Sequence, residues 1–189
     1  MSEEGARANS YALLAAVLRA PPDLSLLNDI ATLPKPEAND DCAKTLSALI
    51  VAATTDENLA DDYHELFIGL GRGKVVPYGS WHITGSMMEK PLVLLRNDLD
   101  MLGITRQKNV VEPEDHAAVL CELMALLCAE SRPDAFARQK KIFDAHLSKW
   151  IEIFFEDVSA QAASDFYRAA GNFGTALMHF EKRYFSMPI

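Results

Sequence analysis

The chain has 189 residues, of which 49% are hydrophobic and 24% are charged, and its formal net charge at pH 7 is -9. This length suits one well-filled core better than two, and the composition excludes a disordered or collagen-like chain. The negative charge repels the phosphates of nucleic acids and would attract a basic partner, so we expect no nucleic-acid binding.

The cysteine content and the N-terminal segment indicate a reducing compartment. Cys42, Cys121 and Cys128 are odd in number and form no C-x-x-C pair, which argues against both a disulfide framework and a zinc knuckle. Residues 1–9 are polar and do not resemble a signal peptide, and no apolar run approaches the roughly 20 residues that span a bilayer. We therefore expect a cytoplasmic protein that does not insert into membranes.

The first third of the chain is predicted to be helical, because apolar residues recur at helical spacing between capping and helix-breaking residues. Four helices are expected: from Asn9 or Ser10 to Pro21, from Asp23 to Pro34, from Asp40 or Asp41 to Thr54, and one that carries Leu59, Tyr63, Leu66 and Phe67. From Ile68 to Ser80 the pattern is lost, since three alternating glycines and Pro77 favour backbone conformations outside the α region. This segment is predicted to be a loop.

The rest of the chain predicts further helices and no strand. They run from Thr84 or Ser86, or from nearer Lys90, to Leu102, then from Pro113 through Cys128, from Pro133 to Phe154, and from Phe166 to Tyr184. No stretch alternates with a period of two, so the sequence predicts an all-α fold. We expect a single-domain bundle of about eight or nine helices over residues 1–189.

The glycines within residues 69–74 invite comparison with phosphate-binding loops, in which backbone amides and a lysine hold an anion. The segment lacks the Gly-Lys-Ser/Thr ending of a P-loop, and no predicted strand precedes it. A structured loop is the favoured interpretation. A nucleotide-regulated switch that uses Gly71 to Lys74 is the alternative.

A cluster of oxygen and imidazole donors, Glu112, Glu114, Asp115 and His116, could ligate a metal. Within this cluster only Glu112 and His116 have the spacing that puts two side chains on one face of a helix, and helix capping is the favoured explanation of the carboxylates. No serine or cysteine stands with a recognisable base and acid. We therefore expect no enzyme, no cofactor and no bound metal, with a metal-dependent hydrolase that uses the Glu112–His116 cluster as the alternative.

Aromatic residues beside acids indicate a peptide-binding site instead. Pro77, Tyr78 and Trp81 lie in or directly after the predicted loop, and the acidic turn begins at Glu112. Aromatic side chains can anchor an apolar segment and carboxylates can pair with arginine, which suits a peptide with an apolar stretch next to basic residues. The alternative is that the aromatics pack the loop onto the helices. His146 lies on an apolar face and is expected to be a hydrogen-bonded core histidine.

The motif Glu-Pro-x-Asp-His is present as Glu112–His116 and is a signature of a known family. The residues that accompany it there are also present: Tyr63, Leu66, Phe67, Gly69, Pro77, Tyr78, Ser80, Thr84, Gly85, Pro91, Leu92, Leu95, Arg96, Phe143, His146, Leu147, Trp150, Phe166 and Tyr167. In this combination the chain resembles the TorD/DmsD/NarJ family of chaperones for bacterial molybdoenzymes, and is most similar to its TorD-like branch. The resemblance covers most of the chain from about Tyr11 to Phe185.

This resemblance implies an all-helical, cytoplasmic, non-enzymatic chaperone without a cofactor, either a monomer or a domain-swapped homodimer. Such proteins bind the twin-arginine signal peptide or the apo form of a molybdopterin-containing reductase, here one like TMAO or DMSO reductase. They assist cofactor insertion and proofread the client before Tat export. The implied peptide-binding residues are Tyr63, Leu66, Phe67, Pro77, Tyr78, Ser80, Trp81, Glu112, Asp115 and His116. His82 departs from the family, which commonly has an aromatic residue there, and this leaves the identity of the client open.

Overall fold

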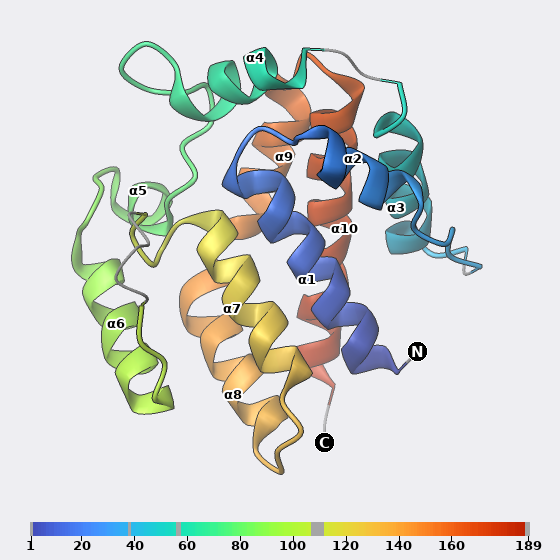
Figure 1. Cartoon of the computed structure of the whole chain (residues 1–189). Coiled ribbons are helices and arrows are strands. Elements are labelled where there is room, and N and C mark those ends of the chain that lie inside the picture. Colours follow the sequence, from blue (N-terminus) through green and yellow to red (C-terminus); the bar gives the residue numbers. More distant parts are fainter. Residues whose placement is uncertain (1, 38, 56–57, 107–111, 188–189) are drawn as a thin grey trace. The chain divides into compact units, whose positions relative to one another are not determined.

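The computed structural model describes residues 2–37, 39–55, 58–106 and 112–187. Over these ranges the chain forms ten α-helices and two short π-helices, with no strand apart from one isolated bridge (Figure 1). The prediction of an all-α fold is confirmed. No helix in the described part of the chain is long and apolar enough to cross a membrane.

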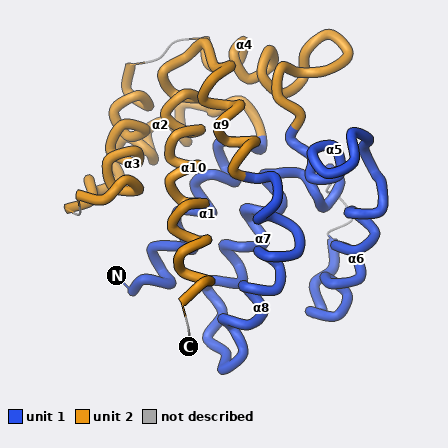
Figure 2. Tube along the Cα trace, turned by 180° about the vertical axis from the view of Figure 1, so that it is seen from behind, with its two compact units in different colours: residues 1–19, 77–151 blue, residues 20–76, 152–189 orange. Residues whose placement is uncertain are grey.

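The chain divides into two compact units (Figure 2). Unit 1 comprises residues 1–19 and 77–151, and unit 2 comprises residues 20–76 and 152–189. Each unit is therefore built from two segments that are distant in the sequence. The expectation of one domain over residues 1–189 stays a prediction.

Unit 1 is organised around a central helix, α7. Its elements are α1 (Glu3–Arg19), α5 (Gly79–Thr84), α6 (Lys90–Leu102), α7 (Ala117–Ala129), α8 (Ala135–Ile142) and the π-helix η2 (Phe143–Leu147). α1 packs along α7, and α7 has buried residues around most of its circumference. The guanidinium of buried Arg7 donates to Gln139 Oε1 at 2.7 Å and to Glu4 Oε2 at 2.8 Å. These partners offset the cost of a charge inside the core.

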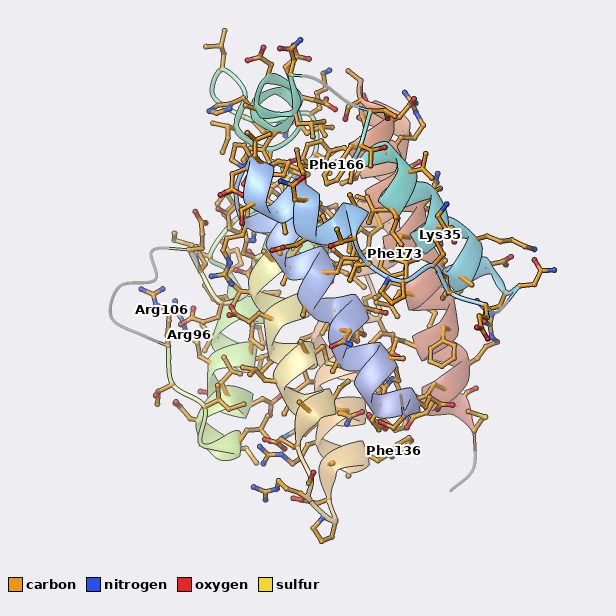
Figure 3. All side chains as sticks on the ribbon, turned by 45° about the vertical axis from the view of Figure 1, so that its right-hand side comes forward. Lys35, Arg96, Arg106, Phe136, Phe166 and Phe173 are labelled. Carbon is orange, nitrogen blue, oxygen red and sulfur yellow. The ribbon has the colours of Figure 1, made fainter. Side chains whose placement is uncertain are left out.

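Unit 2 packs its helices closely. Its elements are α2 (Leu24–Ala31), α3 (Asp41–Ala52), α4 (Leu59–Tyr63), the π-helix η1 (His64–Ile68), α9 (Ile151–Gln161, from Glu152 onward) and α10 (Asp165–Ser186). α10 packs against α3 and buries Phe166 and Phe173 (Figure 3). A Cβ atom at Gly174 would lie 2.2 Å from Cδ1 of Phe155, so only glycine lets α10 approach this ring.

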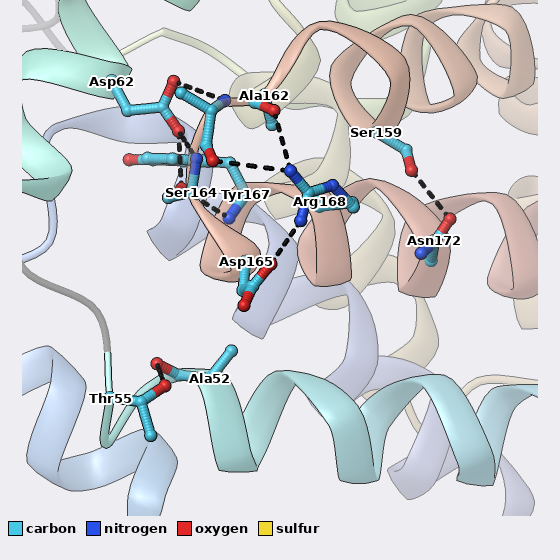
Figure 4. A network of polar contacts seen from close by, with 11 residues as sticks. Ala52, Thr55, Asp62, Ser159, Ala162, Ser164, Asp165, Tyr167, Arg168 and Asn172 are labelled. Carbon is cyan, nitrogen blue, oxygen red and sulfur yellow. Dashed lines mark hydrogen bonds and ion pairs between the residues drawn. The ribbon is translucent and has the colours of Figure 1, made fainter.

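The turn between α9 and α10 is held by a buried carboxylate (Figure 4). Asp62 Oδ1 accepts from the amide of Ala163 at 3.1 Å, and Oδ2 accepts from the amide and the hydroxyl of Ser164 at 2.8 and 2.5 Å. The Ser164 hydroxyl in turn accepts from the amide of Tyr167 and caps α10. Both carboxylate oxygens of Asp62 therefore have hydrogen-bond donors inside unit 2.

Two predicted helix starts are confirmed by their capping bonds. The side chains of Asp23 and Asp40 each accept from a backbone amide three residues later, both at 2.8 Å, and open α2 and α3. Two other predictions are wrong. α1 begins at Glu3, six or seven residues before the predicted caps, and the segment that was expected to be a loop as far as Ser80 already enters α5 at Gly79. The amides at the start of α5 find acceptors elsewhere in the chain, as described below.

The predicted helix start at Pro113 is also wrong. Residues 113–115 form a turn in which the amide of His116 donates to the carbonyl of Pro113 at 3.1 Å, and α7 begins at Ala117. The long helix predicted from Pro133 to Phe154 is interrupted. The amide of Ser148 donates to the carbonyl of Phe143 at 2.9 Å, a π-type bond, and a turn over residues 148–150 separates η2 from α9.

Candidate functional site

The site is built where residues 77–80 meet residues 112–117 in unit 1, a contact that we call the junction. The amide of Ala117 donates to the carbonyl of Pro77 at 2.8 Å, and the amide of Gly79 donates to the carbonyl of Asp115 at 2.9 Å. These bonds pair Tyr78 with His116 in an antiparallel bridge. Two segments that the sequence placed in separate motifs are thus fixed side by side.

Asp115 holds the start of α5. Its backbone carbonyl accepts from the first amide of α5, and its side-chain Oδ2 accepts from the second, that of Ser80, at 2.8 Å. A helix N-terminus leaves amides without partners and favours a negative charge, so one residue caps this helix from 35 positions away. Asp115 is only 4% exposed, and its second carboxylate oxygen, Oδ1, is buried and has no hydrogen-bond partner within the described ranges.

His116 has a different structural role from Asp115. It is the N-cap of α7, where its Nδ1 accepts from the amide of Ala118 at 3.1 Å. This bond requires a lone pair on Nδ1, so the proton of the neutral ring is on Nε2. Burial lowers the pKa of His116, which keeps the ring neutral and suited to this bond. The edge of the ring also contacts Tyr78, with the ring centroids 5.1 Å apart.

The other two carboxylates of the motif have partners within unit 1. The Tyr78 hydroxyl donates to Glu112 Oε2 at 2.5 Å. Arg96, labelled in Figure 3, donates through Nε and Nη2 to Glu114 Oε2 at 2.9 and 2.8 Å. Burial acts to raise the pKa of Glu114, but the hydrogen bonds from Arg96 lower it, so Glu114 stays ionised. Among the carboxylates of the motif, Asp115 has a buried oxygen, Oδ1, that no described residue donates to.

Asp115 lines a pocket of about 100 Å³ inside unit 1. The other lining residues come from α5, α6, α7, η2 and the turn after η2, and they are Gly79, Ser80, Ile83, Pro91, Leu94, Leu95, Leu120, Ala145, His146 and Lys149. Ile83 and Leu94 are 43% and 49% exposed, so the apolar wall continues onto the surface. Such a pocket can accept a hydrogen-bond donor on Asp115 Oδ1 and cover the apolar body that carries it.

Packing around Trp150 shapes the same region. A Cβ atom at Gly79 would lie 3.0 Å from the Trp150 indole, so a side chain there would crowd the ring. His82, the residue that departs from the family pattern, stacks on the Trp150 indole with the ring centroids 5.1 Å apart. Ser80 is fully buried, and its hydroxyl accepts from the amide of Met88 at 3.1 Å. Trp81 is partly exposed.

The structure brings together the predicted site residues of the junction, but Tyr63, Leu66 and Phe67 belong to unit 2. They are 7%, 0% and 8% exposed. The Phe67 ring packs against Tyr63 and Tyr167, with centroids 5.1 and 5.8 Å apart. Their binding role stays a prediction, and a packing role is what their contacts show. A binding role was not predicted for the pocket residues on α6 and η2, because helical periodicity shows which face of a helix is buried and not which residues line a pocket.

The two alternative interpretations find little support in the geometry. Glu112, Asp115 and His116 turn toward different partners, and the described residues contain no group of three or more His, Cys, Asp or Glu side chains that could hold a metal. In the glycine segment Lys74 is bonded to Glu65 at 2.8 Å, and a Cβ atom at Gly73 would lie 2.4 Å from a backbone carbonyl. Close packing therefore accounts for that glycine without an anion.

The chain is similar to known proteins over about two thirds of its length. A family model described as nitrate reductase delta subunit matches residues 34–156. A Haemophilus influenzae protein with the name "Probable Tat proofreading chaperone DmsD" is 33% identical over 128 residues, which are 67% of this chain and 61% of the relative. The chaperone protein TorD of Vibrio cholerae is 27% identical over 133 residues, which are 66% of this chain and 60% of the relative. The matches thus span about three fifths of each relative's length.

A solved structure shows the same fold. A crystal structure of a redox enzyme maturation protein from Archaeoglobus fulgidus superposes with a TM-score of 0.58 over 96% of this chain and 95% of that one. Its sequence identity is 16%, so this likeness concerns the fold alone. The relatives are named as chaperones, in agreement with the prediction that the protein is not an enzyme.

Proposed function

Because this chain belongs to the family of nitrate reductase delta subunits and TorD/DmsD chaperones, we propose that it is a cytoplasmic maturation chaperone for a molybdopterin-containing oxidoreductase. The proposed client is an enzyme of the TMAO or DMSO reductase type. The chaperone binds the client's twin-arginine leader, its apo form or both, assists cofactor insertion, and delays Tat export until this is complete.

The observation that carries the leader-binding proposal is that Asp115, which lines an apolar pocket, has a buried oxygen, Oδ1, with no hydrogen-bond partner among the described residues. A buried carboxylate oxygen without a donor is unfavourable by about 1–3 kcal/mol or more, and a ligand that donates to it recovers this free energy. A twin-arginine leader offers guanidinium donors followed by an apolar segment. Ile83 and Leu94 at the pocket rim would contact that segment.

The predicted site residues divide into two roles under this proposal. Asp115 contacts the leader directly, and partly exposed Tyr78 and Trp81 contribute to the surrounding surface. Pro77, Ser80, Glu112 and His116 hold the junction in shape through the bonds described above. The acidic net charge of -9 speeds the approach of a basic leader, and high salt weakens this effect by screening the charges.

Calorimetric titration tests the proposal directly. The purified protein is titrated with the twin-arginine leader peptides of the host's molybdoenzymes, each beside a twin-lysine control. We expect micromolar or tighter binding of at least one leader, and about tenfold weaker binding of its twin-lysine form, since lysine cannot reproduce the planar donor array of arginine.

A second arm covers the body of the client. The apo-reductase without its leader is titrated in the same way. Binding of the leaderless enzyme alone would refute leader recognition and keep the maturation role. Binding of neither ligand would refute the proposed function.

A further inference from the structure

The π-helix η2 places a second polar side chain in the pocket of Asp115. His146 lies in η2 and lines the pocket, although its side chain is only 7% exposed. The hydrogen bond from Ser148 to Phe143 spans five residues instead of the four of an α-helix, so the helical turn contains one additional residue. Phe143 and Leu147 nevertheless stay in the core at 1% and 0% exposure. Such insertions are less favourable than regular α-helix and are frequent at functional sites.

The orientation of His146 is fixed by an ion-pair network. Its Nε2 lies 2.8 Å from Asp98 Oδ2, and Asp98 Oδ1 lies 2.7 Å from the Lys141 ammonium. Burial acts to raise the pKa of Asp98, but its hydrogen bonds with Lys141 and His146 lower it, so the carboxylate is ionised. An ionised carboxylate accepts, so Nε2 of His146 carries a proton, and Nδ1 is the ring nitrogen that could accept from a ligand.

The pocket therefore combines two buried polar side chains with apolar walls. Asp115 enters from the junction and His146 from η2. A pocket of about 100 Å³ is well below the roughly 300–1,000 Å³ of pockets that hold drug-sized ligands, so it suits one small head group. A group with several N–H donors in one plane can serve both acceptors, whereas a group with a single donor cannot.

We propose that His146 is a second ligand-binding residue of this pocket, and that Asp115 Oδ1 and His146 Nδ1 together take the guanidinium of one arginine of the bound peptide. This inference rests on the proposed function. It adds a residue that the peptide-binding motif does not contain, and assigns the ligand side chain that enters the pocket. Lys149 also lines the pocket, and its charge opposes a cationic ligand, so the two acceptors must outweigh this repulsion.

Two substitutions separate a binding role of His146 from a structural one. His146→Gln keeps a polar group near the position of Nε2, in reach of Asp98, and loses the one at Nδ1. His146→Asn does the reverse. If Nδ1 contacts the ligand, we expect His146→Gln to weaken binding of the twin-arginine leader about tenfold, as for one lost hydrogen bond, and His146→Asn to stay within about threefold of wild type.

The assay reports affinity by calorimetry and folding by thermal denaturation of each variant. Equal leader affinity for wild type, His146→Gln and His146→Asn would overturn the inference while the proposed function stands. The same holds if His146→Asn loses affinity and His146→Gln does not, because that pattern shows that His146 acts through Asp98.

A small probe makes the pocket testable without the leader. Methylguanidinium is titrated against methylammonium while the ring carbon–proton signals of ¹³C-labelled histidine are followed, with His146 assigned by its absence in His146→Gln. A shift of the His146 signal with methylguanidinium, reduced by Asp115→Asn, supports the inference even if no leader binds and the proposed function fails. No shift of that signal at probe concentrations that saturate other effects would overturn it.

Discussion

Asp115 is expected to show opposite effects on stability and on binding when its charge is removed. In Asp115→Asn the amide oxygen can still accept from the Ser80 amide, so the cap of α5 is kept. The NH₂ group then replaces the buried Oδ1 that has no donor. Removing a buried charge lowers the desolvation cost, which offsets the weaker interaction with the N-terminus of α5, and we expect the free energy of unfolding to be unchanged or to rise by up to about 1 kcal/mol.

The same substitution should weaken ligand binding. A charge-assisted hydrogen bond contributes about 1.5–3 kcal/mol, so we expect the Kd for a twin-arginine leader to rise between roughly 10-fold and 150-fold. Calorimetry measures this change, and urea denaturation measures stability. Asp115→Ala is the matched variant: it also removes the acceptor for the Ser80 amide, which is buried, and should lower stability by about 1–3 kcal/mol.

Either the leader affinity or the stability of Asp115→Asn can contradict this expectation. If Asp115→Asn binds the leader as tightly as wild type, Asp115 serves only to cap α5. If Asp115→Asn is destabilised as much as Asp115→Ala, the bond to Ser80 depends on the carboxylate charge, and the unpaired oxygen does not strain the fold.

Three further predictions concern single residues. Burial lowers the pKa of His116 below 6.5, so the unfolded chain takes up a proton at a higher pH than the folded chain does. The free energy of unfolding should therefore be largest above pH 6.5 and fall as the pH drops through the folded-state pKa, by at most about 1.4 kcal/mol per pH unit. His116→Asn, which can also cap α7, should reduce this slope in denaturation curves recorded between pH 7.5 and 5. Gly174→Ala should destabilise the protein by about 1–3 kcal/mol, because its Cβ would overlap the Phe155 ring, and an unchanged midpoint in urea would show that α9 and α10 separate freely. Lys149→Gln should tighten leader binding about twofold to fivefold at low salt and less at high salt, and no gain at low salt would place the leader's cation away from this pocket.

The sequence determined those features whose cause is local. Asp23 and Asp40 could be identified as caps because each bonds an amide only three residues away. The spacing of Phe166, Phe173 and Leu177 predicted α10, since one turn of helix fixes which residues share a face. The motif at residues 112–116 indicated where a site lies, but its residue types favoured helix capping and left metal binding and peptide binding as alternatives.

Tertiary structure alone decided how that motif is used. Pro113 and the acids that follow it look like a helix start, yet the carboxylate of Asp115 serves α5, and this partner is invisible to any local pattern. The spacing of Phe143, Leu147 and Trp150 is that of a regular helix, because these core positions stay buried although the helix is interrupted by η2 and by the turn that follows it.

The same limit applies to the pocket. His146 was correctly expected to be a hydrogen-bonded buried histidine, and its bond to Asp98 joins residues 48 positions apart. That it lines one pocket with Asp115 follows from the packing of α5, α6, α7 and η2, which together determine the burial of each oxygen and nitrogen. Sequence periodicity assigns a residue to a helix face. Whether a buried atom has a hydrogen-bond partner depends on every group packed around it, and this is known only from the tertiary structure.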